Sequence, residues 1–500
     1  MFAPSFSLTF PAQWLAQAAR TWPEQVFISG EQPLTFSEAY QEVSRIAVWM
    51  EQRGIRRGDR ILLILPNSAE AVLILLAALQ QGVIFSVLSP QLQPEGLQRI
   101  ISQCGPKVVF LDQSTGHLQG TVSPDQAVFL ENVKWPTIED VDSPSPAVLQ
   151  PEDIAFLVFT SGSTGTPRGV MLTQKNVGFV CPAILARLKY RAEDCIGLFL
   201  PLAFDYSLYQ IFYACLTGAR LFIGRPEKVG PELPKILARE KVTVLPGVPT
   251  VFAALIKMQR YRPTSLPSLR MMTNTGDHLP KAYIDHLREL FPQAQIFPMF
   301  GLTECKRVSI LCPEEFETHP ESVGRPLDGT TVFAVNAEGE KLPPEQSGEL
   351  VVQGPHLSPG YWGAEEETAK RFRELAGTRS LFTGDYGIVD AQGYITFHSR
   401  GDFVIKHRGT RLSPAEVEEA ACTIPQIISA GCVKDDERDL LCLFLATTDD
   451  TLTEAGILAA LATRLERGKI PDRVYFQPDL PRTTNQKLDR KALRRLLTTV

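Results

Sequence analysis

Residues 156–170 read FLVFTSGSTGTPRGV, which is an apolar strand, a run of small and hydroxylated residues, and the start of a second strand. Glycine lets the backbone approach a ligand closely, while consecutive NH groups and side-chain hydroxyls offer several donors to one anion. Arg168 adds a fixed positive charge. The candidate phosphate contacts are Thr160, Ser161, Gly162, Ser163, Thr164, Gly165 and Arg168.

A hairpin turn is the alternative interpretation, because Gly and Ser dominate turns for local reasons. The length and order of the run favour a phosphate-binding loop. It differs from the P-loop, which ends in Gly-Lys-Ser/Thr and precedes a helix. Here Gly169 to Thr173 reads as a strand.

Composition predicts an ordinary globular enzyme of more than one domain, with 500 residues, of which 44% are apolar and 21% are charged. A net charge of -6 without a basic stripe argues against nucleic acid as a partner. The most apolar stretch, 71–79, is too short to cross a bilayer, so we expect no membrane segment. The first residues lack a secretory pattern, and a cytoplasmic location is expected. The nine cysteines lack C-x-x-C spacing and are predicted to be buried free thiols.

Strand and helix patterns alternate over 59–111 and again over 196–290, which predicts an α/β fold with two mainly parallel sheets. Residues 320–400 contain shorter strands and many Gly and Pro turns, which predicts a small β-barrel or sheet. The stretch 116–151 is interpreted as a connection within the first domain. The final hundred residues read as a separate α/β lobe.

Four segments together resemble the adenylate-forming superfamily, which includes acyl-CoA synthetases, luciferases and the adenylation domains of peptide synthetases. They are the phosphate loop, FGLTE at 300–304, FTGD at 382–385 and PRTTNQKLDR at 481–490, in the family's order. The resemblance implies a large N-terminal domain, 1–401, with two α/β sheets and a β-barrel-like subdomain. It also implies a small mobile α+β domain, 402–500, hinged at Asp402. Two departures are Arg168 for the usual lysine and Gln174 for a frequent histidine.

The resemblance implies ATP and Mg²⁺ as cofactors. Glu304 matches the magnesium ligand, Asp385 the carboxylate that takes both ribose hydroxyls, and Lys487 the adenylation lysine. Isolated from their motifs, these would read as a surface Glu, a Gly-Asp turn and a solvated Lys. Gly409 matches a glycine of the thiol tunnel and could equally be a turn glycine. The remaining nucleotide or catalytic residues implied are Gly276, Asp277, Phe300, Gly301, Thr303 and Arg400.

Asp205, in Phe-Asp-x-Ser at 204–207, resembles the branch that activates amino acids, in which this aspartate binds the substrate ammonium. The alternative is a loop aspartate that caps the helix starting near Leu208. Arg307 is unexpected; it could point away, pair with Asp205, or meet a second substrate carboxylate. The other pocket positions implied are Tyr206, Tyr209, Pro246, Thr273, Thr275, Met299 and Val308.

These observations predict a free-standing ligase that activates a small amino or imino acid, with proline as the first guess by analogy. The expected acceptor is the phosphopantetheine thiol of a separate carrier protein in natural-product biosynthesis. One alternative is an acyl-CoA synthetase that uses CoA. Another is a non-catalytic nucleotide-binding scaffold, which the co-occurrence of Glu304, Asp385 and Lys487 argues against.

Overall fold

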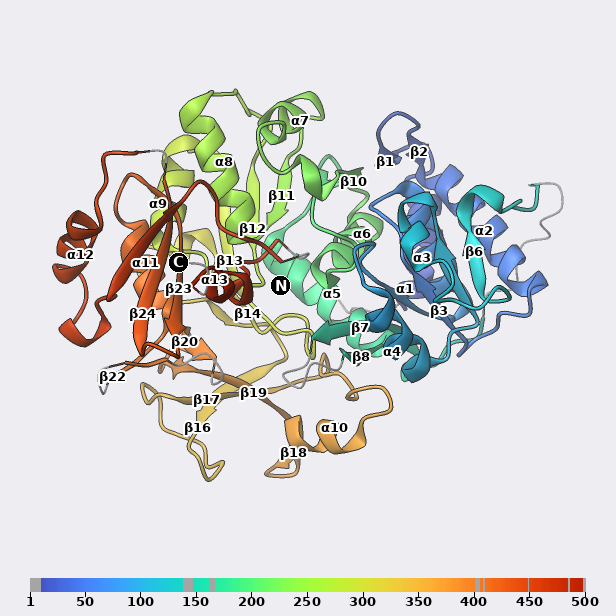
Figure 1. The fold of residues 1–500 in the computed structure, drawn as a ribbon. Coiled ribbons are helices and arrows are strands. Elements are labelled where there is room, and N and C mark those ends of the chain that lie inside the picture. The colour runs from blue at the N-terminus through green and yellow to red at the C-terminus, as the bar shows by residue number, and fades with distance from the viewer. Residues whose placement is uncertain are drawn as a thin grey trace, which may run out of the picture.

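The computed structural model describes residues 10–137, 147–161, 167–400, 405–407, 410–447, 449–483 and 486–497. In Figure 1 the N-terminal elements lie on the right, the middle of the chain at the top centre, and the C-terminal elements on the left. A smaller sheet lies below them. This arrangement of several sheets is the α/β fold that the alternating patterns predict.

The first sheet has six strands in the order β6-β5-β3-β4-β7-β8. It is parallel except for β7 and β8, which form an antiparallel hairpin around the phosphate loop. The strands are β3 (Arg60–Leu63), β4 (Ile84–Val87), β5 (Val108–Leu111), β6 (Ala127–Phe129), β7 (Ile154–Ser161) and β8 (Pro167–Thr173). The helices between them are α2 (Phe36–Gln52), α3 (Ala69–Gln81) and α4 (Pro94–Cys104). Strand β6, at 127–129, joins this sheet, which agrees with the interpretation of its surroundings as a connection within the first domain.

The second sheet has nine strands in the order β15-β14-β13-β12-β11-β9-β10-β1-β2. Strands β1, β10, β9, β11, β12 and β13 are parallel. The strands are β1 (Val26–Ser29), β2 (Leu34–Thr35), β9 (Cys195–Leu198), β10 (Arg220–Ile223), β11 (Val244–Gly247), β12 (Met271–Asn274), β13 (Gln295–Phe300), β14 (Ser309–Ile310) and β15 (Arg325–Pro326). The associated helices are α1 (Pro11–Thr21), α5 (Gln174–Leu188), α6 (Asp205–Thr217), α7 (Leu233–Arg239), α8 (Pro249–Tyr261) and α9 (Lys281–Leu290). Residues of both large sheets contribute to one hydrophobic core.

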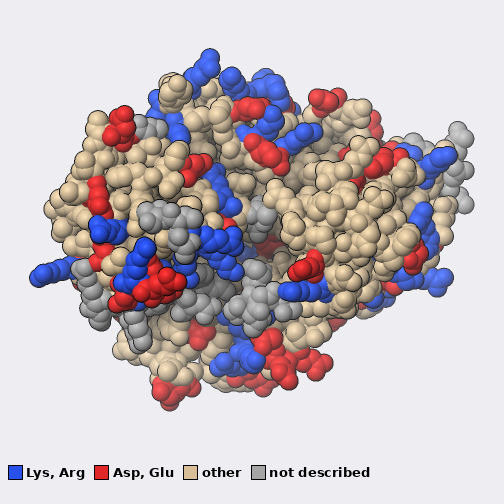
Figure 2. Space-filling view, in the orientation of Figure 1, with Lys and Arg blue, Asp and Glu red and all other residues tan. Residues whose placement is uncertain are grey.

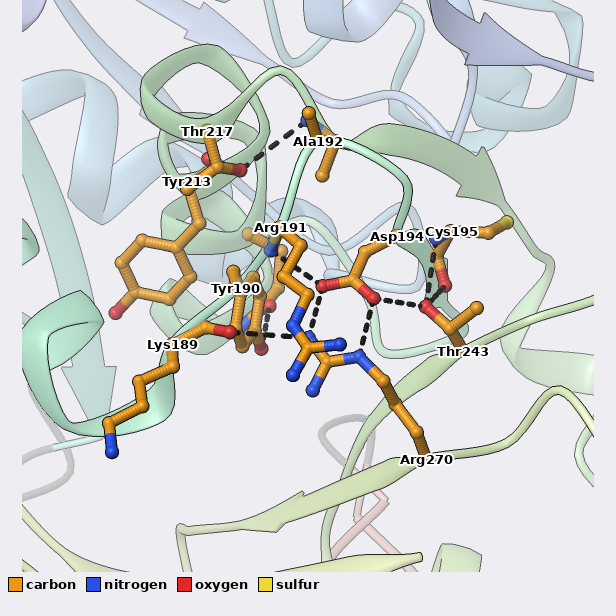
Figure 3. Close-up of polar contacts among 12 residues, drawn as sticks. Lys189, Tyr190, Arg191, Ala192, Asp194, Cys195, Tyr213, Thr217, Thr243 and Arg270 are labelled. Carbon is orange, nitrogen blue, oxygen red and sulfur yellow. Dashed lines mark hydrogen bonds and ion pairs between the residues drawn. The ribbon is translucent and has the colours of Figure 1, made fainter.

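A polar cluster ties together the amino-terminal ends of β9, β11 and β12 (Figure 3). Asp194, which is 3% exposed, accepts hydrogen bonds from Arg270 Nε at 2.7 Å and from Thr243 Oγ1 at 2.8 Å. It also accepts from the Arg191 backbone N–H at 2.7 Å and pairs with Arg270 Nη2. A buried carboxylate requires such a set of donors, so this cluster is a structural joint of the sheet.

A small third sheet lies within 320–400, as predicted, although one of its strands, β19 (Thr378–Val389), is 12 residues long and not short. Its strands are β16 (Thr331–Val335), β17 (Gly348–Gln353), β18 (Phe372–Leu375), β19 (Thr378–Val389) and β20 (Ile395–Arg400). Helix α10 (Glu365–Arg371) immediately precedes β18 and was not predicted. Its sequence, EEETAKR, lacks the apolar spacing that marks an amphipathic helix.

The C-terminal elements have hydrophobic clusters of their own, formed by residues from Ile405 onward. The strands are β21 (Ile405–His407), β22 (Thr410–Leu412), β23 (Ile427–Asp435), β24 (Leu440–Thr447) and β25 (Arg473–Gln477). The helices are α11 (Pro414–Cys422), α12 (Glu454–Ala462) and α13 (Arg490–Leu497). The hinge residue Asp402 lies outside the described residues, so the boundary at 401–402 stays a prediction.

The nine cysteines are free, and all except Cys312 are fully buried, as predicted. Among the described residues, no helix combines the length and apolar character required for a membrane span.

Candidate nucleotide and amino-acid site

The predicted site residues follow the carboxyl ends of strands in both large sheets. The phosphate loop follows β7, Asp205 follows β9, Thr275 and Gly276 follow β12, and the FGLTE segment follows β13. Ligands of open α/β sheets bind at this edge. The topology therefore brings together segments that lie far apart in the sequence.

The phosphate loop is described at its two ends. Thr160 on β7 lies opposite Arg168 on β8 in the hairpin register. The side chain of Ser161 and the whole of Gly162, Ser163, Thr164 and Gly165 lie outside the described residues. The Arg168 guanidinium is 2.8 Å from the Glu367 carboxylate on α10. A phosphate would therefore compete with Glu367 for this cation.

Glu304 is a buried carboxylate, 8% exposed, at the end of the FGLTE segment. Tyr361 donates its hydroxyl hydrogen to Glu304 Oε1 at 2.7 Å, and Arg371 Nη2 lies 3.8 Å from the same oxygen. The backbone of this segment passes close to Lys306. A Cβ on Gly301 would lie 2.3 Å from the Lys306 carbonyl oxygen, so only glycine fits there. Phe300 and Thr303 are half-buried beside it.

These residues fit a magnesium ion carried by a nucleotide. Mg²⁺ is commonly held by one or two carboxylates together with substrate phosphates. None of the described residues forms a group of three or more His, Cys, Asp or Glu side chains suited to hold a metal without a nucleotide. Glu304 is thus the candidate protein ligand.

Asp385 is 5% exposed and lies on β19, opposite Arg400 on β20. Its backbone N–H donates to Thr383 Oγ1 at 3.1 Å. The register brings both nucleotide candidates to adjacent positions, although the side chain of Arg400 is outside the described part of the chain.

Lys487 reaches the N-terminal domain from the C-terminal elements. Its Nζ lies 5.2 Å from the ring centroid of Phe204, and a Cβ on Gly276 would lie 3.0 Å from Lys487 Cε. The neighbouring Gln486 carbonyl accepts a hydrogen bond from Thr250 Oγ1. The predicted adenylation lysine, the predicted adenine segment and the residue before Asp205 therefore lie close together. Gly409 of the thiol tunnel lies outside the described residues.

The contact between the two parts of the chain is polar around Asp277 and His278. Asp277 Oδ2 lies 4.0 Å from Arg490 on α13, and His278 Nε2 lies 3.4 Å from Glu419 on α11. Burial lowers the pKa of His278, but the Glu419 carboxylate outweighs it, so the pKa is raised. A pocket opens at this junction and is lined in part by Lys487. Figure 2 shows a hollow between the two halves of the molecule, with basic side chains beside it.

The residues predicted to line the amino-acid pocket, and their neighbours, are buried and include charges of both signs. Asp205 is 7% exposed and occupies the first turn of α6, which starts three residues earlier than predicted. The N-cap residue of this helix is Phe204, so Asp205 is its first helical residue and not its N-cap. Its cationic neighbour is Lys306, with Nζ 3.6 Å from Asp205 Oδ2. The predicted lining residues Tyr206, Tyr209, Thr275, Met299 and Val308 are all buried.

Lys306 was missed by the sequence reasoning and is a distinctive group of the pocket. Its ammonium lies 4.2 Å from the centroid of the Tyr209 ring. Burial lowers the pKa of Lys306 to about 8, and Asp205 opposes part of this effect. No motif marks this lysine, which sits at a left-handed backbone position in the loop after Glu304.

Arg307 is 1% exposed and belongs to the pocket wall. Its Nη1 donates to Thr275 Oγ1 at 2.5 Å, and its Nε has no hydrogen-bond partner in the described structure. The guanidinium carbon lies 5.7 Å from the Tyr206 ring centroid. The sequence left three options for Arg307, one of which was an ion pair with Asp205. In the structure Asp205 pairs with Lys306 instead.

Comparisons with known proteins agree with this geometry. A family model described as AMP-binding enzyme matches residues 15–362. Delta-poly-L-ornithine synthetase from Acinetobacter baumannii is 29% identical over 98% of this chain, which spans 37% of that protein. A long-chain-fatty-acid–CoA ligase from Escherichia coli is 25% identical over 95% of this chain and 92% of its own length. Tyrocidine synthase 3 from Brevibacillus parabrevis is 26% identical over 94% of this chain, which spans 7% of that protein.

Solved structures give the same result. VinN is 33% identical with a TM-score of 0.72, over 78% of this chain and 99% of VinN. VinN in complex with L-aspartate matches at 32% identity with a TM-score of 0.71, over 78% of this chain and 98% of that one. The anthranilate CoA ligase AuaEII shares the fold, with a TM-score of 0.87 at 22% identity over 98% of each chain. With a family model matching most of its length, this chain belongs to the family of AMP-binding enzymes.

Proposed function

We propose that this chain activates a small amino acid that carries a second carboxylate, forming aminoacyl-AMP and pyrophosphate from ATP. The activated acid is then passed to the phosphopantetheine thiol of a carrier protein. The observation that carries the proposal is the pocket that holds Asp205, Lys306 and Arg307 beside Lys487. The first step rests also on membership of a family whose enzymes use ATP.

Adenylation requires a substrate carboxylate oxygen to attack the α-phosphorus while pyrophosphate leaves. Positive charge around that phosphorus stabilises the transition state. Lys487, as a flexible point charge, would bridge the carboxylate and the α-phosphate and orient the attack. Magnesium held by Glu304 would neutralise phosphate charge, and Arg168 would exchange Glu367 for a phosphate. Asp385 would accept both ribose hydroxyls.

The substrate ammonium is assigned to Asp205. A separation of 3.6 Å from Lys306 exceeds hydrogen-bond length, so the carboxylate retains acceptor capacity. An incoming ammonium would bind Asp205 and free Lys306 to turn toward another anion. Because a fatty acid offers no such cation, this pocket favours an amino acid over a long-chain acid.

The second carboxylate is assigned to Arg307, assisted by Lys306. Two cations and one carboxylate leave an excess positive charge among buried side chains, which is costly unless a ligand neutralises it. The unpartnered Nε and the planar fork of Arg307 suit a carboxylate. Proline, the guess from analogy, would leave this charge unmatched. The complex of VinN with L-aspartate supports the assignment by analogy.

The proposed thiol acceptor is supported by relatives and not by the described residues. Tyrocidine synthase 3 and VinN support a carrier protein, whereas the fatty-acid ligase and AuaEII favour CoA. The acyl-CoA synthetase therefore remains the second candidate function.

Pyrophosphate exchange distinguishes the amino-acid ligase from the acyl-CoA synthetase. We expect exchange with L-aspartate, and much weaker exchange with L-asparagine, L-proline, succinate and long-chain fatty acids. Succinate tests whether Lys306 itself replaces the substrate ammonium. Exchange with fatty acids alone, or with none of the acids, would overturn the proposal. Loading of a phosphopantetheinylated carrier protein against CoA then identifies the acceptor.

A further inference from the structure

Helix α10 lies against three motifs of the site, although it contains none of them. Its Glu367 pairs with Arg168 of the phosphate loop at 2.8 Å. Its last residue, Arg371, faces both Glu304 and the FTGD segment. In Figure 1 this helix sits beneath the hairpin β7–β8 at the edge of the lower sheet.

Arg371 contacts the FTGD backbone with one terminal nitrogen and the Glu304 carboxylate with the other. Nη1 donates to the Thr383 carbonyl at 2.6 Å and to the Phe382 carbonyl at 3.2 Å. Nη2 lies 3.8 Å from Glu304 Oε1, the oxygen that also accepts from Tyr361. One guanidinium thus contacts the carboxylate proposed to hold magnesium and the backbone that leads to Asp385, the carboxylate proposed to hold the ribose.

Gly384 makes this contact sterically possible. A Cβ at this position would lie 2.7 Å from Arg371 Nη1, and the backbone φ of +70° is one that glycine adopts readily. The glycine of the Gly-Asp pair therefore has a role beyond forming a turn, because it leaves room for the guanidinium.

A single ammonium cannot reproduce this contact. The planar fork of arginine presents several donors in fixed directions, whereas lysine presents one compact charge.

Both contacts to the Glu304 carboxylate among the described residues are made to Oε1. These contacts leave Oε2 as the oxygen that a metal would contact.

We propose that Arg371 is a positioning residue that fixes the Glu304 carboxylate relative to Asp385, so that metal binding and ribose recognition are coupled through one side chain. The inference rests on the nucleotide half of the proposed function, and it concerns a residue that does not itself contact the substrate.

Isothermal titration of the full chain with ATP tests this coupling without turnover. Two affinity ratios are measured: ATP with Mg²⁺ against ATP with EDTA, and ATP against 2′-deoxy-ATP in Mg²⁺. In Arg371→Met we expect both ratios to fall by about threefold to tenfold, as charge-assisted hydrogen bonds are lost. A general loss of stability would lower all affinities and leave the ratios unchanged.

Arg373→Met is the matched control. Arg373 lies two residues further along, with its guanidinium 4.5 Å from the ring centroid of Phe382, and it is exposed. We expect both ratios to match the wild type in this variant. Arg371→Lys, which keeps the charge, replaces the methionine variant if that variant fails to fold. Both affinity ratios should also fall in Arg371→Lys, because lysine cannot contact Glu304 and the FTGD backbone at the same time.

Each result has a distinct meaning. Unchanged ratios in folded Arg371→Met or Arg371→Lys would overturn the inference, and so would a fall in only one ratio. If the wild-type chain bound no ATP, the proposed function itself would fail instead.

Discussion

Two buried aspartates lie at opposite ends of strand β9 and have different surroundings. Asp194, at the amino-terminal end, accepts from Arg270, Thr243 and a backbone N–H, as Figure 3 shows. Asp205, beyond the carboxyl-terminal end, has Lys306 as its cationic neighbour at 3.6 Å. Arg307 lies in the same pocket with one nitrogen unpartnered in the described structure.

The different surroundings of Asp194 and Asp205 are those expected of a structural ion pair and of a binding site, respectively. A buried charge with a full set of donors needs nothing else, whereas one with loose partners and excess positive charge nearby is costly in the absence of a ligand. We therefore propose that one end of this strand serves stability and that the segment beyond the other end serves recognition. Four predictions sharpen this contrast.

The largest effect is expected at the recognition end, from Lys487→Ala. We predict a loss of adenylate formation of about 10³-fold, because a charge aimed at the transition state is removed. Transfer from a preformed aminoacyl-AMP to the thiol should be retained. Pyrophosphate exchange and thioester formation measure the two steps, with Lys491→Ala on α13 as the control. Equal losses in both steps would contradict the assigned role.

Asp194→Asn should chiefly affect stability. Removing one partner of a buried pair leaves Arg270 uncompensated, and the free energy of unfolding should fall by about 3 kcal/mol. Asp205→Asn should change it by only about 1 kcal/mol, because the pKa of Lys306 is already lowered to about 8 and its proton is lost cheaply. Urea denaturation compares the variants. Similar destabilisation by both would remove the distinction between the two ends.

Arg307→Met should change specificity while leaving the fold intact. We expect kcat/KM for L-aspartate to fall by about 10-fold to 100-fold, and kcat/KM for L-asparagine to change little, because a charge-assisted contact to the second carboxylate is lost. Arg270→Met is the matched comparison and should lower stability without altering the aspartate-to-asparagine ratio. A constant ratio in Arg307→Met would show that this guanidinium does not select the substrate.

The smallest effect concerns pH. The folded chain lowers the pKa of Lys306 from the usual 10.5 to about 8, so the unfolded chain binds more protons between these values. Stability should therefore rise with pH across this window, as the cost of the buried charge disappears. Conversely, kcat/KM for L-aspartate should fall as pH rises through about 8, because the deprotonated amine no longer attracts the second carboxylate. Lys306→Met should abolish this fall in kcat/KM at high pH. If the fall persisted in the variant, another group would be responsible for the titration.

The sequence predicts the layered fold well, because strands and helices alternate with strong apolar patterns. The two strands that flank the phosphate loop were predicted from residues 156–173, and they are observed as the antiparallel pair β7–β8. The missed elements lack such patterns: β6 is three residues long, and α10 has the sequence EEETAKR. Helix α6 begins at Asp205, although the apolar pattern starts only at Leu208.

The site was predictable where motifs carry it and not elsewhere. Glu304, Asp385 and Lys487 stand in recognisable segments, and their assigned roles stay predictions. Lys306 and Arg371 were missed because a single cation in a loop or at a helix end has no sequence signal. Their contacts arise only when distant strands meet at one edge of the sheets.

A crystal structure of this chain with a non-hydrolysable aspartyl-adenylate analogue tests the central claim most directly. We predict that the ammonium of the ligand binds Asp205, that its second carboxylate binds Arg307, and that Lys306 leaves Asp205. An undisturbed Asp205–Lys306 pair, with the second carboxylate directed away from Arg307, would contradict this account of the pocket.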